Sequence, residues 1–67
     1  MLNLQKIRLD KNLNISQLSR LSGVSRAYIT QLDREIYQNP TIEVLVKLCK
    51  ALDVSPNELI KEEYWKK

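Results

Sequence analysis

The sequence predicts an all-α fold in which five short helices form a bundle within one domain of 67 residues. Two patterns lead to this prediction. Apolar residues recur at helical spacing in each segment, and no segment alternates apolar and polar residues over the length of a strand. Asn, Ser and Thr residues also stand directly before these segments, as helix-capping residues do. The sequence shows no repeat, low-complexity stretch or linker that would divide the domain.

Asparagine residues delimit the first two helices. A first helix is expected to start at a cap formed by Asn3 and to end near Asn12. Asparagine tolerates the left-handed backbone conformation that closes many helices. Asn14 can cap a second helix, which Gly23 interrupts. The sequence therefore predicts two short helices before residue 24.

Hydroxyl residues begin the next two helices. Ser25 can cap a third helix with Ile29 and Leu32 on its inner face, and a loop follows from residue 36 to residue 40. Thr41, which comes directly after the loop, can cap a fourth helix. The core stripe of that helix consists of Leu45, Leu48, Cys49 and Leu52.

The fifth helix has a strong start signal. Ser55 is the cap, Pro56 stands at the first helical position, and Glu58 completes a capping box. The tail from residue 62 to residue 67 either extends this helix or frays.

Composition excludes several classes of protein. With no His and one Cys, the chain offers no zinc site, no His-based catalysis and no intramolecular disulfide. We expect no metal and no cofactor, and the lack of a nucleophile–base pair or phosphate-binding loop indicates that the protein is not an enzyme. Cys49 is interpreted as a small core residue, with a redox switch as the alternative. No apolar run could cross a bilayer and no signal-peptide pattern is present, so a cytoplasmic protein is expected.

Basic charge gathers in the N-terminal half of the sequence. Residues 1–34 contain six Lys or Arg and two Asp residues, whereas residues 35–67 contain five basic and six acidic residues. The first half thus has a formal charge of +4 and the second half −1. A polyanion such as nucleic acid is the natural partner of such a half, and a solvated surface of mixed charge is the alternative.

The most informative stretch is residues 15–34, where two short helices meet at a sharp turn. Ser19 is small, which lets the second of these helices approach the first closely. Gly23 stands at the turn, where a left-handed backbone is required. The apolar residues spaced to hold the second helix against the core are Val24, Ile29 and Leu32. This spacing predicts a helix-turn-helix, with a helical hairpin of no particular function as the alternative.

On these residues the chain resembles the phage-repressor and Cro class of helix-turn-helix proteins, also called the XRE family. The resemblance covers about residues 4–60. Gly23-Val24-Ser25-Arg26 matches the family's turn, and Leu52-Asp53-Val54-Ser55 with Glu58-Leu59 matches its end. It implies a five-helix bundle that binds a near-palindromic, double-stranded DNA operator as a homodimer and regulates transcription, repression being the expected outcome. No small-molecule ligand or membrane partner is implied.

Three positions depart from the family pattern. Ile15 stands where the family often has a Gln that braces a phosphate and the recognition helix. Asn12 replaces a usual Gly, and the loop of residues 35–40 lacks a Gly and is about one residue longer.

The recognition helix is expected to comprise residues 25–35, with its first turns facing base edges in the major groove. Arg26 can pair bidentately with a guanine or bind a phosphate, and Gln31 can read an adenine. The candidate base contacts are Arg26, Ala27, Tyr28, Thr30 and Gln31. Phosphate contacts are expected from helix N-termini and from the loop after the third helix. Their candidates are Ser16, Gln17, Arg34, Tyr37, Gln38, Asn39 and Thr41.

The resemblance also implies an ion pair between Arg8 in the first helix and Asp33 at the end of the third; the alternative is two unrelated surface charges. A dimer interface is expected on the fifth helix. If that helix continues into the tail, one face presents Leu59, Ile60, Tyr64 and Trp65, and aromatic residues are typical interface anchors. In the alternative, Trp65 folds back onto Leu9 or Leu21. A second function class is an antitoxin or protein-interaction module built on the same fold.

Overall fold

The described part of the chain folds into five α-helices, as the sequence predicted. The computed structural model describes residues 2–36 and 40–62. The helices are α1 (Leu4–Asp10), α2 (Ile15–Ser22), α3 (Arg26–Asp33), α4 (Ile42–Leu52) and α5 (Pro56–Leu59). The described ranges contain no β-strand, only one isolated antiparallel bridge between Leu2 and Ile60. Within those ranges, no helix combines the length and apolar character needed to cross a membrane.

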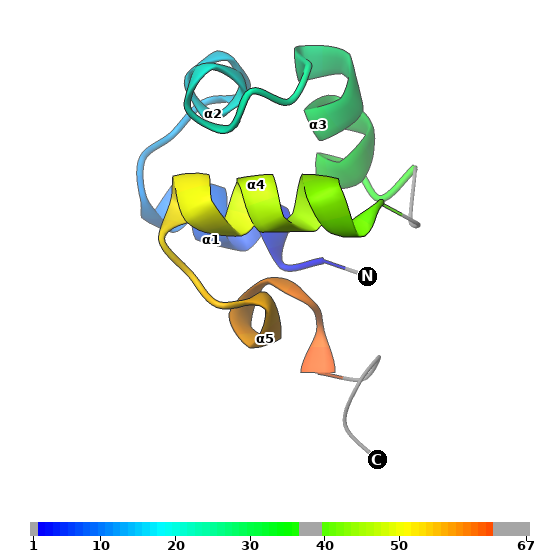
Figure 1. Ribbon diagram of the computed structural model, residues 1–67. Helices are drawn as coiled ribbons and strands as arrows, with labels where there is room; N and C mark the ends of the chain where they lie inside the picture. Colours follow the sequence, from blue (N-terminus) through cyan, green and yellow to red (C-terminus); the bar gives the residue numbers. More distant parts are fainter. Residues whose placement is uncertain (1, 37–39, 63–67) are drawn as a thin grey trace.

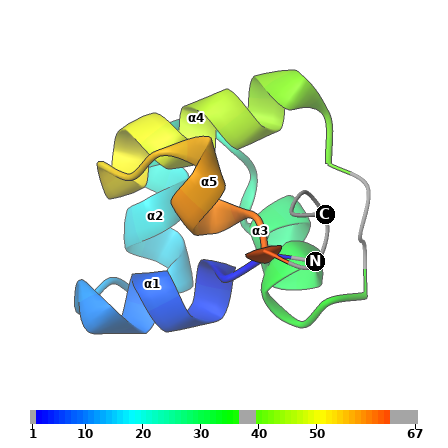
Figure 2. The ribbon, with the colours of Figure 1, turned by 90° about the horizontal axis from the view of Figure 1, so that it is seen from below.

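Helix α4 occupies the middle of the molecule. In Figure 1 it lies between α2 and α3 above and α5 below, and Figure 2 shows α1 on the far side, beside α2 and α3. Each helix contributes at least one fully buried side chain to a shared core. These side chains are Leu4, Leu18, Ile29, Leu48, Leu52 and Leu59. The core therefore holds α2 and α3 together at one end of the molecule.

Four of the predicted caps form as expected. The side chains of Asn14, Ser25, Thr41 and Ser55 each accept a hydrogen bond from the backbone N–H three residues further on. Asn3 stands before α1, but its side chain does not cap that helix. Instead its Nδ2 donates to the Glu58 carbonyl at 3.2 Å, and its backbone N–H donates to the Leu59 carbonyl at 2.7 Å. Asn3 thus ties the start of the chain to α5.

Among the described residues, four have left-handed backbones, and two of these were predicted. Gly23 has φ +76° and Asn12 has φ +57°, as expected at the ends of α2 and α1. Glu35, after α3, has φ +60°, and Asp53, which caps the end of α4, has φ +56°. A non-glycine residue in this region costs about 1–2 kcal/mol, so the rest of the fold must hold Glu35 and Asp53 there.

The structure contradicts one residue of the predicted dimer surface, Leu59, and the fifth helix ends at that residue. Helix α5 ends at Leu59, and Ile60 is extended at φ −86° and ψ 128°, where it forms the bridge with Leu2. The backbone bond from Asn3 to the Leu59 carbonyl competes with continuation of the helix. Leu59 is 0% exposed and belongs to the core, so it cannot be an interface residue. Ile60 is half-buried, and Tyr64 and Trp65 lie outside the described residues.

Cys49 belongs to the core, as interpreted from the sequence, and burial raises the pKa of its thiol, with Glu58 adding a smaller contribution. Leu9 and Leu21 are exposed, at 57% and 61%.

Candidate nucleic-acid interface

The turn between α2 and α3 is fixed by hydrogen bonds as well as by glycine. The Gly23 N–H donates to the Ser19 carbonyl at 2.9 Å. The Ser19 hydroxyl donates to the Val24 carbonyl at 2.6 Å, and Val24 is only 6% exposed. The sequence indicated Ser19 for its small size but not for this bond. The two bonds set the angle at which α3 leaves α2.

Helix α3 presents one face to the core and the other to solvent. Ile29 and Leu32 are 0% and 3% exposed, in agreement with their predicted inward positions. Among the candidate base contacts, Arg26, Ala27 and Gln31 are exposed and Thr30 is half-buried. Tyr28 differs from the expectation of an exposed side chain, because it is half-buried and packs against the core cluster. The described side chains best placed to meet a ligand on this helix are therefore Arg26, Ala27 and Gln31.

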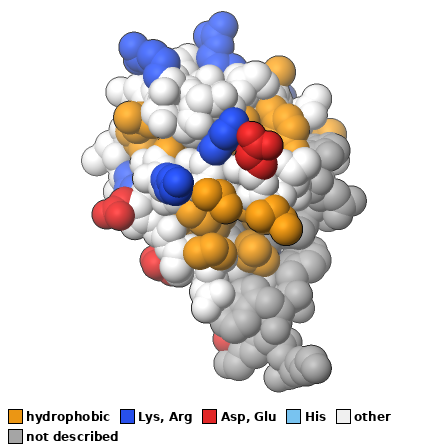
Figure 3. Space-filling model, in the orientation of Figure 1, with side chains coloured by type: hydrophobic (Ala, Val, Ile, Leu, Met, Phe, Trp, Pro, Cys, Tyr) orange, Lys and Arg blue, Asp and Glu red, His pale blue; other side chains and the backbone are white. Residues whose placement is uncertain are grey.

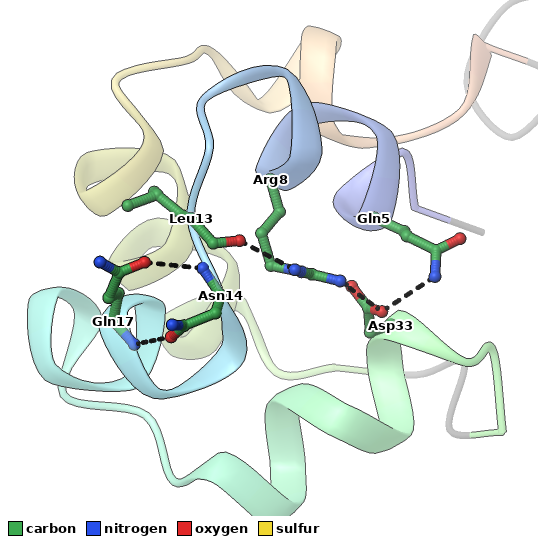
Figure 4. A network of polar contacts seen from close by, with 6 residues as sticks. All are labelled: Gln5, Arg8, Leu13, Asn14, Gln17 and Asp33. Carbon is green, nitrogen blue, oxygen red and sulfur yellow. Dashed lines mark hydrogen bonds and ion pairs between the residues drawn. The ribbon is translucent and has the colours of Figure 1, made fainter.

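An ion-pair network anchors the far end of α3 (Figure 4). Arg8 donates from Nε to Asp33 Oδ1 at 3.0 Å and from Nη2 to Oδ2 at 3.1 Å, so the expected pair is present and bidentate. The same guanidinium donates from Nη1 to the Leu13 carbonyl at 2.8 Å, and Gln5 donates to Asp33 at 3.3 Å. The Arg8 and Asp33 side chains are 10% and 6% exposed. The network joins α1, the α1–α2 loop and the end of α3 into one unit.

Two polar side chains at the start of α2, Ser16 and Gln17, have hydrogen-bond donors that a ligand could reach. Gln17 closes a capping box, since its Oε1 accepts from the Asn14 N–H at 2.9 Å while Asn14 Oδ1 accepts from the Gln17 N–H at 2.8 Å. The amide nitrogen of Gln17 points away from Asn14 (Figure 4). Ser16, beside it, accepts a hydrogen bond from Arg26 Nη1 at 3.4 Å. The candidate sets on α2 and α3 are therefore adjacent.

The other candidate phosphate contacts flank the segment between α3 and α4. Arg34 and Thr41 are exposed, and the Thr41 hydroxyl accepts from the Val44 N–H at 3.2 Å. Tyr37, Gln38 and Asn39 lie outside the described residues.

Basic side chains project from the side of the molecule formed by α2 and α3. In Figure 3, Lys and Arg side chains project from the top of the view, over these two helices, and the acidic side chains visible in that view lie lower. Asp33, the acidic residue within α3, is almost fully covered by its contact with Arg8. The exposed surface of the two helices is thus suited to an anionic ligand.

Comparisons with known proteins give consistent results. A family model described as "Helix-turn-helix" matches residues 4–59. The HTH-type transcriptional regulator SinR of Bacillus subtilis (strain 168) is 31% identical over 61 residues, which are 91% of this chain and 55% of SinR. Among solved structures, the restriction-modification controller protein C.AhdI from Aeromonas hydrophila has a TM-score of 0.78 at 35% identity, covering 85% of each chain. A SinR/SinI protein complex contains a chain with a TM-score of 0.83 at 31% identity, covering 91% of this chain and 59% of that one.

The chain spans about half the length of the SinR relatives it matches, at 55% and 54%. The names of these relatives describe regulators and a controller, in agreement with the expectation that this chain is not an enzyme.

Proposed function

This chain belongs to the helix-turn-helix family whose model matches residues 4–59, as the resemblance in the sequence indicated, and from this premise we propose that it is a sequence-specific DNA-binding regulator of transcription. Its described helices act as one domain that places α3 in the major groove, and repression is the expected effect. A protein that binds an operator works where that DNA is, which we take to be the cytoplasm.

The observation that supports this proposal most directly is the two-sided character of α3. One face is locked onto the core through Ile29 and Leu32, and the other presents Arg26 and Gln31 to solvent. A helix held rigidly from behind can present side chains to base edges with little loss of conformational entropy on binding. Arg26 can donate two parallel hydrogen bonds to guanine, and Gln31 can pair with adenine.

In this proposal, polar groups around α3 bind the DNA backbone and fix the protein's register. Ser16 and Gln17 bind one phosphate at the start of α2. Thr41 and Arg34 bind the DNA backbone near the start of α4. Backbone N–H groups at these helix starts add to the attraction for phosphate. Ala27 and Thr30 are left to contact thymine methyl groups.

Selection of bound sequences from a random DNA pool tests the proposal. The expected result is a defined motif whose recovery falls steeply with salt concentration. Arg26→Ala should weaken binding to the selected site by about 1–3 kcal/mol and relax the preference at one base pair. Recovery of no motif by the unmodified protein would overturn sequence-specific binding.

We also propose that the protein binds as a homodimer on a near-palindromic operator, with half-sites about one helical turn, ~34 Å, apart. Since Leu59 is buried, the surface is placed on α4 instead of α5. Ile42 is 79% and Val46 41% exposed, and both lie on one face of that helix. Hydrophobic side chains gather over and just below α4 in Figure 3, lower in the view than the basic side chains that project over α2 and α3.

Sedimentation of Val46→Glu over a range of concentrations tests this surface. The variant should remain folded, since Val46 is exposed, and should stay monomeric where the unmodified protein associates. Leu21→Glu, a matched change at an exposed position on α2, serves as the control. Equal self-association of Val46→Glu and the unmodified protein would refute the α4 surface.

A protein-interaction function is the second candidate, because one structural relative was solved as a complex of SinR with SinI. A salt-dependent shift of operator DNA distinguishes the two, since a pure interaction module would give none.

A further inference from the structure

We propose that Ser16 is a positioning residue that holds the Arg26 guanidinium so that its Nε–Nη2 edge reads a guanine. The inference rests on the proposed function. It assigns guanine as the base that Arg26 contacts and Ser16 as the residue that orients the Arg26 side chain. It starts from the contact between Arg26 Nη1 and Ser16 Oγ at 3.4 Å.

The contact joins the first turns of two helices. Ser16 lies in the first turn of α2, and Arg26 is the first residue of α3. Only Nη1 takes part, and within residues 2–36 and 40–62 no hydrogen bond occupies Nε or Nη2 of Arg26. A guanidinium is planar, so fixing Nη1 on one oxygen restricts the direction in which the opposite edge points. That edge has two parallel N–H donors.

A second arginine in the same molecule shows how such a guanidinium is used. Arg8 donates from Nη1 to a single oxygen, the Leu13 carbonyl, and its Nε and Nη2 bind both oxygens of Asp33. Arg26 has the first half of this arrangement, with Ser16 in place of Leu13. A ligand with a planar group and two neighbouring acceptors would bind the Nε and Nη2 donors of Arg26 as Asp33 binds those of Arg8.

Guanine fits that requirement at this place in the fold. Its N7 and O6 are coplanar acceptors at the spacing of the arginine fork, and residues at the start of a recognition helix face base edges. The Ser16 hydroxyl accepts from Arg26 and so keeps its own hydrogen to donate to a phosphate oxygen. The phosphate contact and the base contact are thereby coupled through one hydroxyl group.

The neighbouring Ile15 cannot share the role proposed for Ser16. Ile15 has no hydrogen-bonding side chain, and it is half-buried against the core. Ser16 supplies a hydroxyl one residue further along the helix.

The test is selection from a random DNA pool with the unmodified protein, Ser16→Ala, Ser16→Thr and Arg26→Lys, each checked for folding by circular dichroism. A defined guanine is expected in the motif of the unmodified protein. Arg26→Lys should lose it, because a lysine cannot donate bidentately. Ser16→Ala should reduce that preference about tenfold, the effect of one hydrogen bond to a charged group, and leave the other motif positions unchanged. Ser16→Thr retains a hydroxyl and should retain the guanine.

Two outcomes would overturn the inference while the proposed function survives. One is a Ser16→Ala motif identical to that of the unmodified protein. The other is equal weakening by Ser16→Ala on the selected site and on random DNA, which would make Ser16 a phosphate contact only. A pool from which the unmodified protein selects no motif would overturn the proposed function, and this inference with it.

Discussion

Replacement of Asp33 by Ala is expected to be among the most damaging single changes in the chain. It removes both acceptors of the Arg8 fork and leaves the guanidinium, whose side chain is 10% exposed, with the Leu13 carbonyl alone. Gln5 loses its acceptor too, but it is exposed and can turn to water.

The magnitude follows from burial. Leaving one member of a buried ion pair without its partner costs about 3–5 kcal/mol. The total stability of a 67-residue domain is only about 3–10 kcal/mol. Asp33→Ala should therefore remove between about a third and all of the free energy of unfolding. The double variant Arg8→Met with Asp33→Leu removes the charge along with its partner and should recover most of the loss.

Urea denaturation of Arg8→Met, Asp33→Leu and the double variant measures the coupling energy between the two positions. Glu43→Gln is the control, because the Glu43–Lys47 pair at 3.3 Å is exposed and should contribute only about 0.3–0.5 kcal/mol. If the coupling between Arg8 and Asp33 falls below about 0.5 kcal/mol, the pair behaves like a surface pair and the reasoning from burial is refuted.

Three further changes test other parts of the structure. Gly23→Ala should lower the free energy of unfolding in urea by about 1–2 kcal/mol, because a Cβ at Gly23 would have no atom within 4 Å and only the φ of +76° opposes it. Gly23→Asn should lower it less, and equal losses would contradict this explanation. Lys61 Nζ donates to Glu35 Oε1 at 2.6 Å, and this hydrogen bond and the lysine charge lower the pKa of Glu35. The contact therefore stabilises the fold at pH values above the ordinary carboxyl pKa, and its contribution is lost as the pH falls through the lowered pKa. The stability difference between Glu35→Gln and the unmodified protein should accordingly vanish in acid, and its persistence there would refute the contact. Cys49, buried and with a raised thiol pKa, should alkylate slowly in buffer and rapidly in urea; rapid alkylation of the folded protein would show that the thiol is accessible.

Local signals explain why most of the fold was predictable. Asn14, Ser25, Thr41 and Ser55 each cap the helix that follows through a bond to a neighbour three residues away, so the sequence contains both partners close together. The end of α5 depends on Leu2 and Asn3, which are more than fifty residues away. No nearby residue stops the helix at Leu59, and so sequence patterns favoured its continuation.

The same distinction applies to the candidate site. Arg26 and Gln31 follow from helical spacing once the turn at Gly23 is placed, whereas the contact from Arg26 to Ser16 depends on how two helices cross. Tyr28 lies at a position that helical spacing alone leaves on the outer face, yet its ring is large enough to reach the core. Contacts between helices thus decide which exposed positions are available to a ligand.

Arg8 and Arg26 lie at opposite ends of the recognition helix, and they differ in where the acceptors of their hydrogen bonds come from. At its C-terminal end, Arg8 binds Asp33 within the fold, so folding itself satisfies the guanidinium. At its N-terminal end, the exposed Arg26 has one side-chain hydrogen bond within residues 2–36 and 40–62, to Ser16, so its remaining donors are satisfied by water or by a ligand. Changes at the first arginine should therefore appear in unfolding measurements, and changes at the second only in DNA binding. Arg26→Lys should leave the urea midpoint unchanged while it alters the selected motif, and a shift of the midpoint comparable to that of Asp33→Ala would show that Arg26 is part of the fold's own stabilising network instead.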